Sequence, residues 1–443
     1  MNPLRALRAL ALALVSLAAS ACALISPPSG PHPGSPAPVT LAAAPPGPLL
    51  AGAWVEDVTP GAPAFMAGFG VHKRHQATDG AITVRALALR RGARTVALVA
   101  CDLIGLHEYQ VEEVRRRLRG LLAPDALLVA CTHTHAGPDT LGMWGLPPLF
   151  SGLDPEVTER VLAGIARAVE EALLRLEPVR VRWGRAEAPP VGISKNRREP
   201  ARIDRRLTAL AFDRPDGRAV ATLVHFACHP ETLGSKNTTL SPDFPGALRQ
   251  RVERERGGVC VFLNGALGGM VTVDRQGEPS LAEAARIGTA LGDLALGALA
   301  AGQPFPAELG LSYARAPLLL PVESRRYHLG DLFGIFGPRP FVDGGYTPSE
   351  VWALRLGPAV FLTVPGEALP KLGFELGSLA SGAPRLIVGL GNDELGYLVH
   401  ESDWEDERYA YERSVSPGRS AVGVIRAGAR AALAALGALR PGG

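Results

Sequence analysis

The chain has 443 residues and a mass of 46.5 kDa, with 47% hydrophobic and 20% charged residues. This composition is typical of a globular protein with an extensive core, and it excludes wholesale disorder. The net charge is only +3, from 46 basic and 43 acidic residues. Because basic and acidic residues are so nearly equal in number, a nucleic acid is not expected as the partner.

The first 22 residues have the pattern of a secretory signal peptide. Arg5 and Arg8 precede an apolar run over 9–19, and Ala19-Ser20-Ala21 forms a small-residue cleavage site. The run is shorter than the roughly 20 residues that a membrane span needs. Cys22 follows directly and is a candidate lipid-carrying cysteine of a bacterial lipoprotein, although Ala19 stands where such sites usually have leucine. We therefore expect an exported, periplasmic or extracellular protein, with peripheral or Cys22-anchored membrane association left open.

Residues 23–49 are rich in proline, glycine and alanine, which predicts a disordered linker. No comparable linker divides the rest, so a single catalytic domain is expected over 50–440. The remaining cysteines have no C-x-x-C spacing, and burial as small hydrophobic residues is the simplest interpretation. Export also permits a disulfide, and the sequence does not choose a pairing among Cys101, Cys131, Cys228 and Cys260.

The body alternates short apolar runs with helical patterns. Strands are predicted at 93–100, 126–130, 219–227, 259–263 and 360–364. Helices are predicted at 108–122, 154–176, 281–299 and 421–439, the second with Asp154 as N-cap before Pro155. The expected fold is an α/β layered sandwich of mixed β-sheet flanked by helices. Residues 318–347 are expected to form an irregular loop or lid.

Polar side chains follow several of the predicted strands at the point where each one ends. They are Asp102, His133 and His135, His229, Asn264, and Glu367. In α/β proteins ligands bind at the ends of the strands. Side chains two residues apart in an extended segment share a face, so both histidines of the 133–135 pair can address one site. Two histidines and a carboxylate are a common ligand set of catalytic zinc, which predicts a metallohydrolase.

The chain resembles the catalytic domain of the neutral/alkaline ceramidase family, zinc-dependent amidases that split N-acylsphingosine. The most specific match is Thr132-His133-Thr134-His135-Ala136-Gly137-Pro138. Weaker matches follow in family order and extend the resemblance over about residues 51–426. They are 51–60, 66–69, 80–86, 196–197, 228–230, 241–246, 365–367 and 392–397.

The resemblance implies a set of site residues. Zn²⁺ ligands would be His133, His229, Glu367 and Tyr397, the last chosen over Leu395 as the second aromatic position of its motif. The catalytic histidine would be His135, and Arg197 would lie near the scissile amide. The tyrosine that contacts the reacting group would be Tyr411, with Tyr409 as the alternative.

The chemistry expected of such a site is amide hydrolysis. Zinc lowers the pKa of bound water to about 7, and the resulting hydroxide would attack the amide carbonyl. Zinc, Tyr411 and Arg197 would stabilise the oxyanion, while His135 would carry the proton from water to the leaving amine. Asp102 or Asp243 would orient a histidine, although a turn or helix cap is the simpler interpretation of each aspartate.

One segment departs from the family. A polar motif with a serine is expected near the active site, but this chain has Gly269 and Val271 at the polar positions, with Thr272 only a neighbour. We therefore keep three hypotheses: a ceramidase-like zinc amidase acting on an N-acyl lipid, a zinc hydrolase of another amide or ester, and an inactive surface-tethered binding protein. No obligate protein partner is expected.

Overall fold

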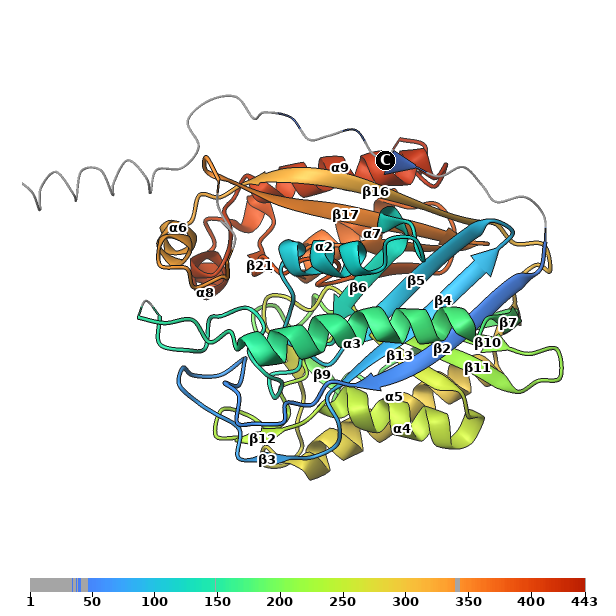
Figure 1. Cartoon of the computed structure of the whole chain (residues 1–443), viewed down its shortest axis with the longest axis horizontal. Coiled ribbons are helices and arrows are strands. Elements are labelled where there is room, and N and C mark those ends of the chain that lie inside the picture. The colour runs from blue at the N-terminus through green and yellow to red at the C-terminus, as the bar shows by residue number, and fades with distance from the viewer. Residues whose placement is uncertain are drawn as a thin grey trace, which may run out of the picture.

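The structure is a computed structural model that describes residues 34, 37, 39–40, 47–147, 149–338 and 343–442. The predicted signal peptide, Cys22 and most of the predicted linker lie outside these residues. Three five-stranded sheets and their covering helices form most of the described body, and three two-stranded sheets lie beside them (Figure 1). The expected domain limits, 50 and 440, stay a prediction.

The first sheet carries the segment that leads to the paired histidines. Its strand order is β6 (Leu127–Cys131), β5 (Arg94–Cys101), β4 (Thr83–Arg91), β2 (Leu49–Asp57) and β7 (Glu177–Pro178). The long helix α3 (Pro155–Leu174) packs on β2 and β4, and α2 (Glu108–Arg117) lies beside it. As predicted, the Asp154 side chain caps α3 by accepting hydrogen bonds from two main-chain amides.

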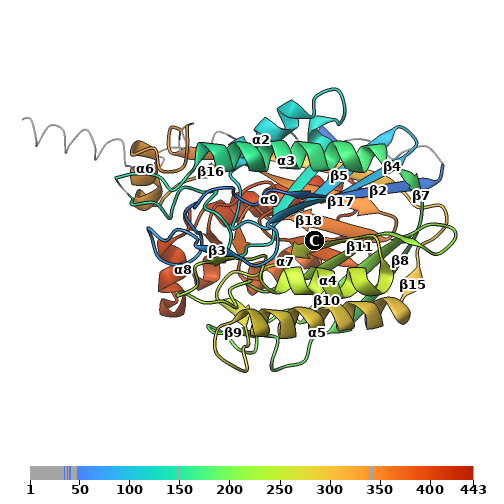
Figure 2. The same ribbon diagram turned by 60° about the horizontal axis from the view of Figure 1, so that its bottom comes forward.

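The second sheet carries the segment that leads to His229. Its order is β13 (Val259–Asn264), β11 (Ala219–Phe226), β10 (Arg206–Asp213), β8 (Arg180–Glu187) and β15 (Gln303–Pro304). Helices α4 (Phe244–Arg256) and α5 (Leu281–Ala300) cover its outer face (Figure 2). β11 and β13 are parallel, so both of their carboxyl ends reach the same edge.

The third sheet carries the segment that leads to Glu367. Its order is β1 (Val39–Thr40), β16 (Leu311–Pro321), β17 (Tyr346–Leu356), β18 (Ala359–Thr363) and β20 (Arg385–Val388). Helix α9 (Ala421–Ala435) packs on β16 and β17, and α7 (Pro370–Leu379) packs on β20. The three sheets meet in one hydrophobic cluster that includes Leu98, Leu223 and Phe361.

These observations confirm the layered α/β prediction and the strands and helices named from the sequence. The expectation of an irregular loop over 318–347 is only partly confirmed: residues 333–338 and 343–345 form neither helix nor strand, but the rest of the described segment is largely regular. β16 extends to Pro321, α6 (Arg325–Leu332) follows, and β17 begins at Tyr346. Leu318 and Leu320 are buried on one face of β16, and the prolines around them remain compatible with pairing to β17. Tertiary pairing therefore overrides the local loop signals here.

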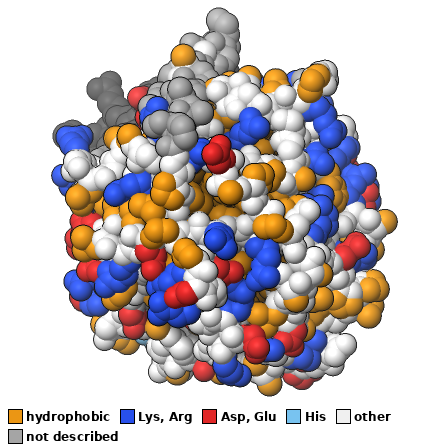
Figure 3. Space-filling model, turned by 90° about the vertical axis from the view of Figure 1, so that its right-hand side faces the viewer, with side chains coloured by type: hydrophobic (Ala, Val, Ile, Leu, Met, Phe, Trp, Pro, Cys, Tyr) orange, Lys and Arg blue, Asp and Glu red, His pale blue; other side chains and the backbone are white. Residues whose placement is uncertain are grey.

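The four cysteines named from the sequence are all buried and free: Cys101, Cys131, Cys228 and Cys260. In the part of the chain that the structure describes, no helix has the length and apolar character needed to cross a bilayer. Basic, acidic and hydrophobic side chains are interspersed on the face at the right of Figure 1, which is turned toward the viewer in Figure 3.

Candidate active site

Short strand pairs just beyond the main sheets position the predicted ligand residues. His133 follows β6, and His229 follows β11 and donates its main-chain N–H to Val271 on β14 (Val271–Val273). Glu367 starts β19 (Glu367–Ala368), which is parallel to β21 (Tyr397–Leu398) and places Glu367 opposite Tyr397. A chain segment that follows a strand of each sheet thus contributes to one site.

Asn264 ties the two histidine segments together. Its side-chain amide donates hydrogen bonds of 2.8 Å to the carbonyl oxygens of Thr132 and of Cys228. Each acceptor lies directly before a histidine, and Asn264 is fully buried. A satisfied buried amide of this kind fixes the distance between the two segments.

His133, His229 and Glu367 converge on one point. Glu367 Oε2 lies 2.9 Å from His229 Nε2 and 3.5 Å from His133 Nε2. The opposite ring nitrogens, Nδ1, contact main-chain carbonyls: His133 reaches Ile104 at 2.6 Å and His229 reaches Val271 at 3.0 Å. Because a carbonyl only accepts, each Nδ1 carries the proton, and each Nε2 offers its lone pair to the centre.

This donor set fits a divalent metal ion such as zinc. It consists of two imidazole nitrogens held in the ligating tautomer and one carboxylate oxygen, all buried. The ligating nitrogens of His133, His135 and His229 lie within 4.8 Å of one another. The arrangement therefore supplies two histidines, a carboxylate and a third histidine beside them.

His135 differs from the other two histidines because its ring is unpartnered. Neither ring nitrogen forms a hydrogen bond among the described residues, and Nδ1 lies 4.0 Å from Glu231 Oε2. Phe69 packs edge-on against this ring, with 4.9 Å between the two ring centroids. Gly68 has φ +99°, and a Cβ atom there would meet the His135 Cβ at 2.5 Å. The close approach therefore requires glycine at position 68.

The electrostatics of the cluster separate the roles of its members. Burial raises the pKa of Glu367, but His133 and His229 outweigh it and hold that pKa below the ordinary value. Burial lowers the pKa of His229, while Glu367 raises it above the ordinary value overall. Burial, reinforced by His133 and His229, holds the pKa of His135 well below the ordinary value. His135 is therefore a neutral imidazole able to accept a proton at neutral pH.

Backbone strain is concentrated around the same segments. His133, Met270 and Asn392 have φ values of 67°, 61° and 64°, a region that non-glycine residues rarely adopt. Met270 precedes Val271, whose carbonyl holds His229. Such strain persists where the surrounding contacts over-determine a geometry, and it is frequent at functional sites.

Two tyrosines border the cluster. Tyr397 is buried, and its ring centroid lies 5.8 Å from that of Tyr411, which is 51% exposed on α8 (Ala410–Ser414). Burial raises the pKa of Tyr397 well above the ordinary value, so its phenol is neutral in this structure. Tyr409 points elsewhere, because its hydroxyl donates to Glu199 Oε2 at 3.0 Å. Of the two alternatives, only Tyr411 lines the cavity.

The cluster opens into a cavity of about 260 Å³. One wall is apolar and is formed by Ile104, Leu141, Met143, Trp144 and Phe336. Tyr327 on α6 also lines it and donates its hydroxyl to the Leu395 carbonyl at 2.8 Å. The cavity therefore pairs a polar floor of histidine, carboxylate and phenol groups with an apolar flank.

The expectation that Asp102 or Asp243 orients a histidine is wrong in this geometry. Asp102 accepts two hydrogen bonds from Arg249, at 2.7 and 2.8 Å, and others from Thr83. Asp243 caps α4 and binds the Thr232 main-chain amide at 2.8 Å. Their oxygens are occupied by these partners, and main-chain carbonyls orient His133 and His229 instead.

Arg197 is exposed and does not line the cavity, so its expected role near the amide stays a prediction. The next residue, Arg198, has a clear structural connection. Its Nε donates at 2.7 Å to Glu412, which is fully buried beside Tyr411. Arg198 thus anchors the short helix that carries Tyr411.

Sequence reasoning missed two polar residues near the cluster, Glu231 and Glu394. Glu231 accepts a hydrogen bond from Thr272 with one carboxylate oxygen and faces His135 with the other. Glu394 lines the cavity, and its Oε2 has no hydrogen-bond partner among the described residues. Two sequence signals could have identified these residues. Glu231 lies two positions after His229, and Glu394 lies between Asn392 and Tyr397.

Comparison with known proteins supports the resemblance found in the sequence. Residues 50–266 match the family model described as neutral/alkaline non-lysosomal ceramidase, N-terminal. The neutral ceramidase of Pseudomonas aeruginosa is 23% identical over 214 residues, which make up 44% of this chain and 31% of that relative. Residues 50–266 contain all three clustered histidines, while Glu367 and the three cavity tyrosines, Tyr327, Tyr397 and Tyr411, lie beyond them.

Solved structures confirm the fold over most of the chain. The crystal structure of neutral ceramidase from Pseudomonas aeruginosa superposes with a TM-score of 0.72 at 19% identity, covering 87% of this chain and 74% of that one. A structure described as ceramidase complexed with C2 gives a TM-score of 0.69 at 19% identity, covering 87% and 75%. The fold therefore extends well past the region matched by sequence.

Proposed function

We propose, from the match of residues 50–266 to the neutral/alkaline non-lysosomal ceramidase family, that this protein is a zinc-dependent hydrolase of N-acyl amides. Its substrate would be ceramide or a related N-acyl lipid, cleaved by water into a fatty acid and an amine. The observation that carries the proposal is the convergence of His133 Nε2, His229 Nε2 and Glu367 Oε2.

Those three residues would hold the zinc ion, with Tyr397 as the fourth ligand. A bound zinc ion supplies Lewis acidity, which polarises a carbonyl and makes water acidic near neutral pH. The main-chain carbonyls of Ile104 and Val271 keep the two histidines in the tautomer that ligation needs.

His135 would handle the proton. Its ring lies beside the ligand histidines, its nitrogens are unpartnered, and its lowered pKa keeps it neutral. It would accept a proton from the attacking water and donate it to the amide nitrogen as the carbon–nitrogen bond breaks. Glu231, 4.0 Å from Nδ1, would stabilise the protonated imidazole between these two transfers.

Tyr411 would stabilise the oxyanion. Its hydroxyl is a neutral donor, since burial raises its pKa above the ordinary value, and it lines the cavity from α8. The apolar wall around Trp144 and Phe336 would take the beginning of an acyl chain, because such chains bind where apolar surface excludes water.

The test combines metal analysis with a substrate panel. Purified protein and its His229→Ala variant are analysed for zinc, and both are assayed on long-chain and short-chain N-acylsphingosines and on amides without a sphingoid base. About one zinc per chain, absent in the variant, with preference for N-acylsphingosines supports the proposal. Zinc with turnover only of other amides or esters favours a different hydrolase. Absence of zinc and of turnover favours a binding protein.

We also propose export with lipid attachment at Cys22, from the signal-peptide pattern of the first 22 residues. Intact mass measurement after expression in a bacterial host tests it. A mature chain that begins at a diacylated Cys22 supports anchoring, and one cleaved without lipid supports release.

A further inference from the structure

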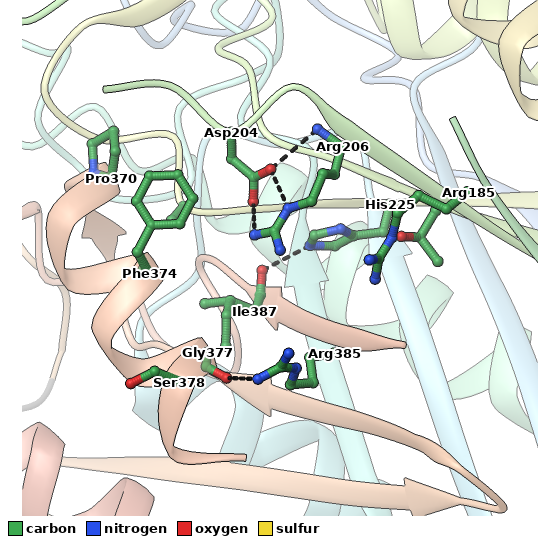
Figure 4. Close-up of a pocket in the computed structure, with 13 residues that line it drawn as sticks. Arg185, Asp204, Arg206, His225, Pro370, Phe374, Gly377, Ser378, Arg385 and Ile387 are labelled. Atoms are coloured by element: carbon green, nitrogen blue, oxygen red, sulfur yellow. Dashed lines mark hydrogen bonds and ion pairs between the residues drawn. The ribbon is translucent and has the colours of Figure 1, made fainter. Parts of the chain in front are cut away.

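A second cavity, separate from the candidate active site, lies between α7 and the second sheet. It has a volume of about 220 Å³ and shares no lining residue with the first cavity in the part of the chain described. Strands β8, β10 and β11 form one side, and α7 and β20 form the other (Figure 4). We call it the arginine pocket, after Arg185, Arg206 and Arg385 in its lining.

The charges of the arginine pocket are not balanced. Arg206 pairs with Asp204 through two hydrogen bonds of 2.7 and 2.6 Å, as Figure 4 shows. Within the described residues, Arg385 donates only to main-chain carbonyls, those of Gly377 at 3.1 Å and Ala380 at 3.4 Å. Arg185 forms no ion pair with any carboxylate in the described residues. The lining residues thus carry three guanidinium groups and one carboxylate, and Glu187, opposite Arg206 on β8, offsets part of the remaining positive charge.

Two of the three arginines have a lowered pKa with burial as its largest cause, while the hydrogen bond to Asp204 raises the pKa of Arg206. The pKa of Arg185 is lowered by burial and then by Arg206 and Arg385, with Asp204 opposing. The pKa of Arg385 is lowered by burial and then by Arg440 and Arg206. Like charges held together in this way are relieved by a bound anion, which lowers the free energy of the complex.

The rest of the lining defines the shape of the ligand. Phe374, Pro370 and Ile387 supply apolar surface, and hydroxyls come from Thr208 and Ser378. His225 donates from Nε2 to the Ile387 carbonyl at 2.8 Å, and burial lowers its pKa, so it adds no charge. Beside an anion-binding wall there is thus a small apolar face, which suits an organic group.

We propose that the arginine pocket binds a small phosphate monoester. Arg185 and Arg385 have no carboxylate partner among the described residues and are available to an anion, and their forked guanidinium donors match phosphate oxygens. The ester group would lie against Phe374 and Pro370. The volume is below the roughly 300–1,000 Å³ of drug-sized pockets, which limits the ligand to a small molecule. This proposal does not depend on the hydrolase function, because the two cavities are lined by different residues.

The test is calorimetric titration of the whole chain with inorganic phosphate and with phenyl phosphate, at constant ionic strength in a chloride background. We expect both to bind, with phenyl phosphate tighter. The double variant R185Q/R385Q should weaken both at least tenfold, and Asp204→Asn should tighten both by removing the competing carboxylate. The matched control is Arg430→Gln, since Arg430 is exposed and has no carboxylate partner among the described residues.

Several outcomes would overturn the proposal. They are no binding above the chloride background, equal binding by R185Q/R385Q at unchanged thermal stability, or tighter binding of succinate than of phosphate. The variant Phe374→Ala should bind phosphate as before and lose the preference for phenyl phosphate. If the preference survives, the ester group does not lie where we place it.

Discussion

Glu367 and Glu350 are both buried glutamates whose pKa lies below the ordinary value, yet their surroundings differ. Glu350 on β17 is fully buried and accepts hydrogen bonds from Arg115 at 2.9 and 2.6 Å, from Arg315, and from Asn392. Its partners are permanently charged or amide donors. Glu367 faces the Nε2 atoms of His133 and His229, whose lone pairs point toward the same centre.

The difference separates a structural site from the candidate active site. Around Glu350 every oxygen is satisfied by the protein, so a ligand has nothing to bind. Around Glu367 the two Nε2 atoms and Oε2 form a donor set that fits a metal ion, and the neighbouring His135 nitrogens and Glu394 Oε2 have no hydrogen-bond partner among the described residues. Asp102 resembles Glu350 in this respect, because its oxygens are already bound by Arg249. Its role is therefore structural.

The largest expected effect comes from comparing substitutions of Glu367 and Glu350. Glu367→Gln should abolish zinc binding and lower N-acyl amide hydrolysis by about 10³-fold or more, because several kcal/mol of transition-state stabilisation depend on the metal. Zinc content and turnover are measured together. Glu350→Gln is the matched control and should retain zinc in the folded fraction. Equal zinc in both variants would contradict the comparison.

His135→Ala should lower the rate by about 10²–10⁴-fold while zinc remains bound, because it removes proton transfer without removing a ligand. Turnover is measured beside metal content. Loss of zinc in this variant would instead make His135 a ligand.

Glu350→Gln should destabilise the fold by about 3–5 kcal/mol at pH 7, because Arg115 and Arg315 lose the charge of their partner. Burial raises the pKa of Glu350, but the two arginines outweigh it and hold that pKa below 4.5. A lowered folded-state pKa adds stability above pH 4.5, and this contribution is lost as the pH falls through the folded value. Denaturant unfolding across pH should show the wild-type advantage shrink below that point. A constant difference across pH would contradict it.

The smallest effect is expected at Glu231. Glu231→Gln should keep zinc and lower kcat by about 10-fold, the low end for groups that orient a catalytic histidine. The pH dependence of kcat should shift, because the carboxylate no longer stabilises protonated His135. Thr272→Val, which removes the hydroxyl that holds Glu231, should give a weaker change in the same direction. An unchanged pH profile in both variants would leave Glu231 a structural residue.

Sequence by itself determined the parts of this protein that depend on local order. Apolar runs predicted the strands, and the cap at Asp154 predicted the start of α3, which the structure confirms. Polar residues at strand ends placed His133, His229 and Glu367 together before any fold was known. Spacing alone also put His135 beside His133, because alternate residues of an extended segment share a face.

Only the tertiary structure decided which partner each polar group finds. Asp102 binds Arg249, which lies 147 positions away in the sequence, and Arg198 rather than Arg197 anchors the Tyr411 helix. The arginine pocket likewise joins residues of the second sheet to α7 and β20. Such choices depend on long-range packing and on which donors are already occupied, and no local pattern encodes either.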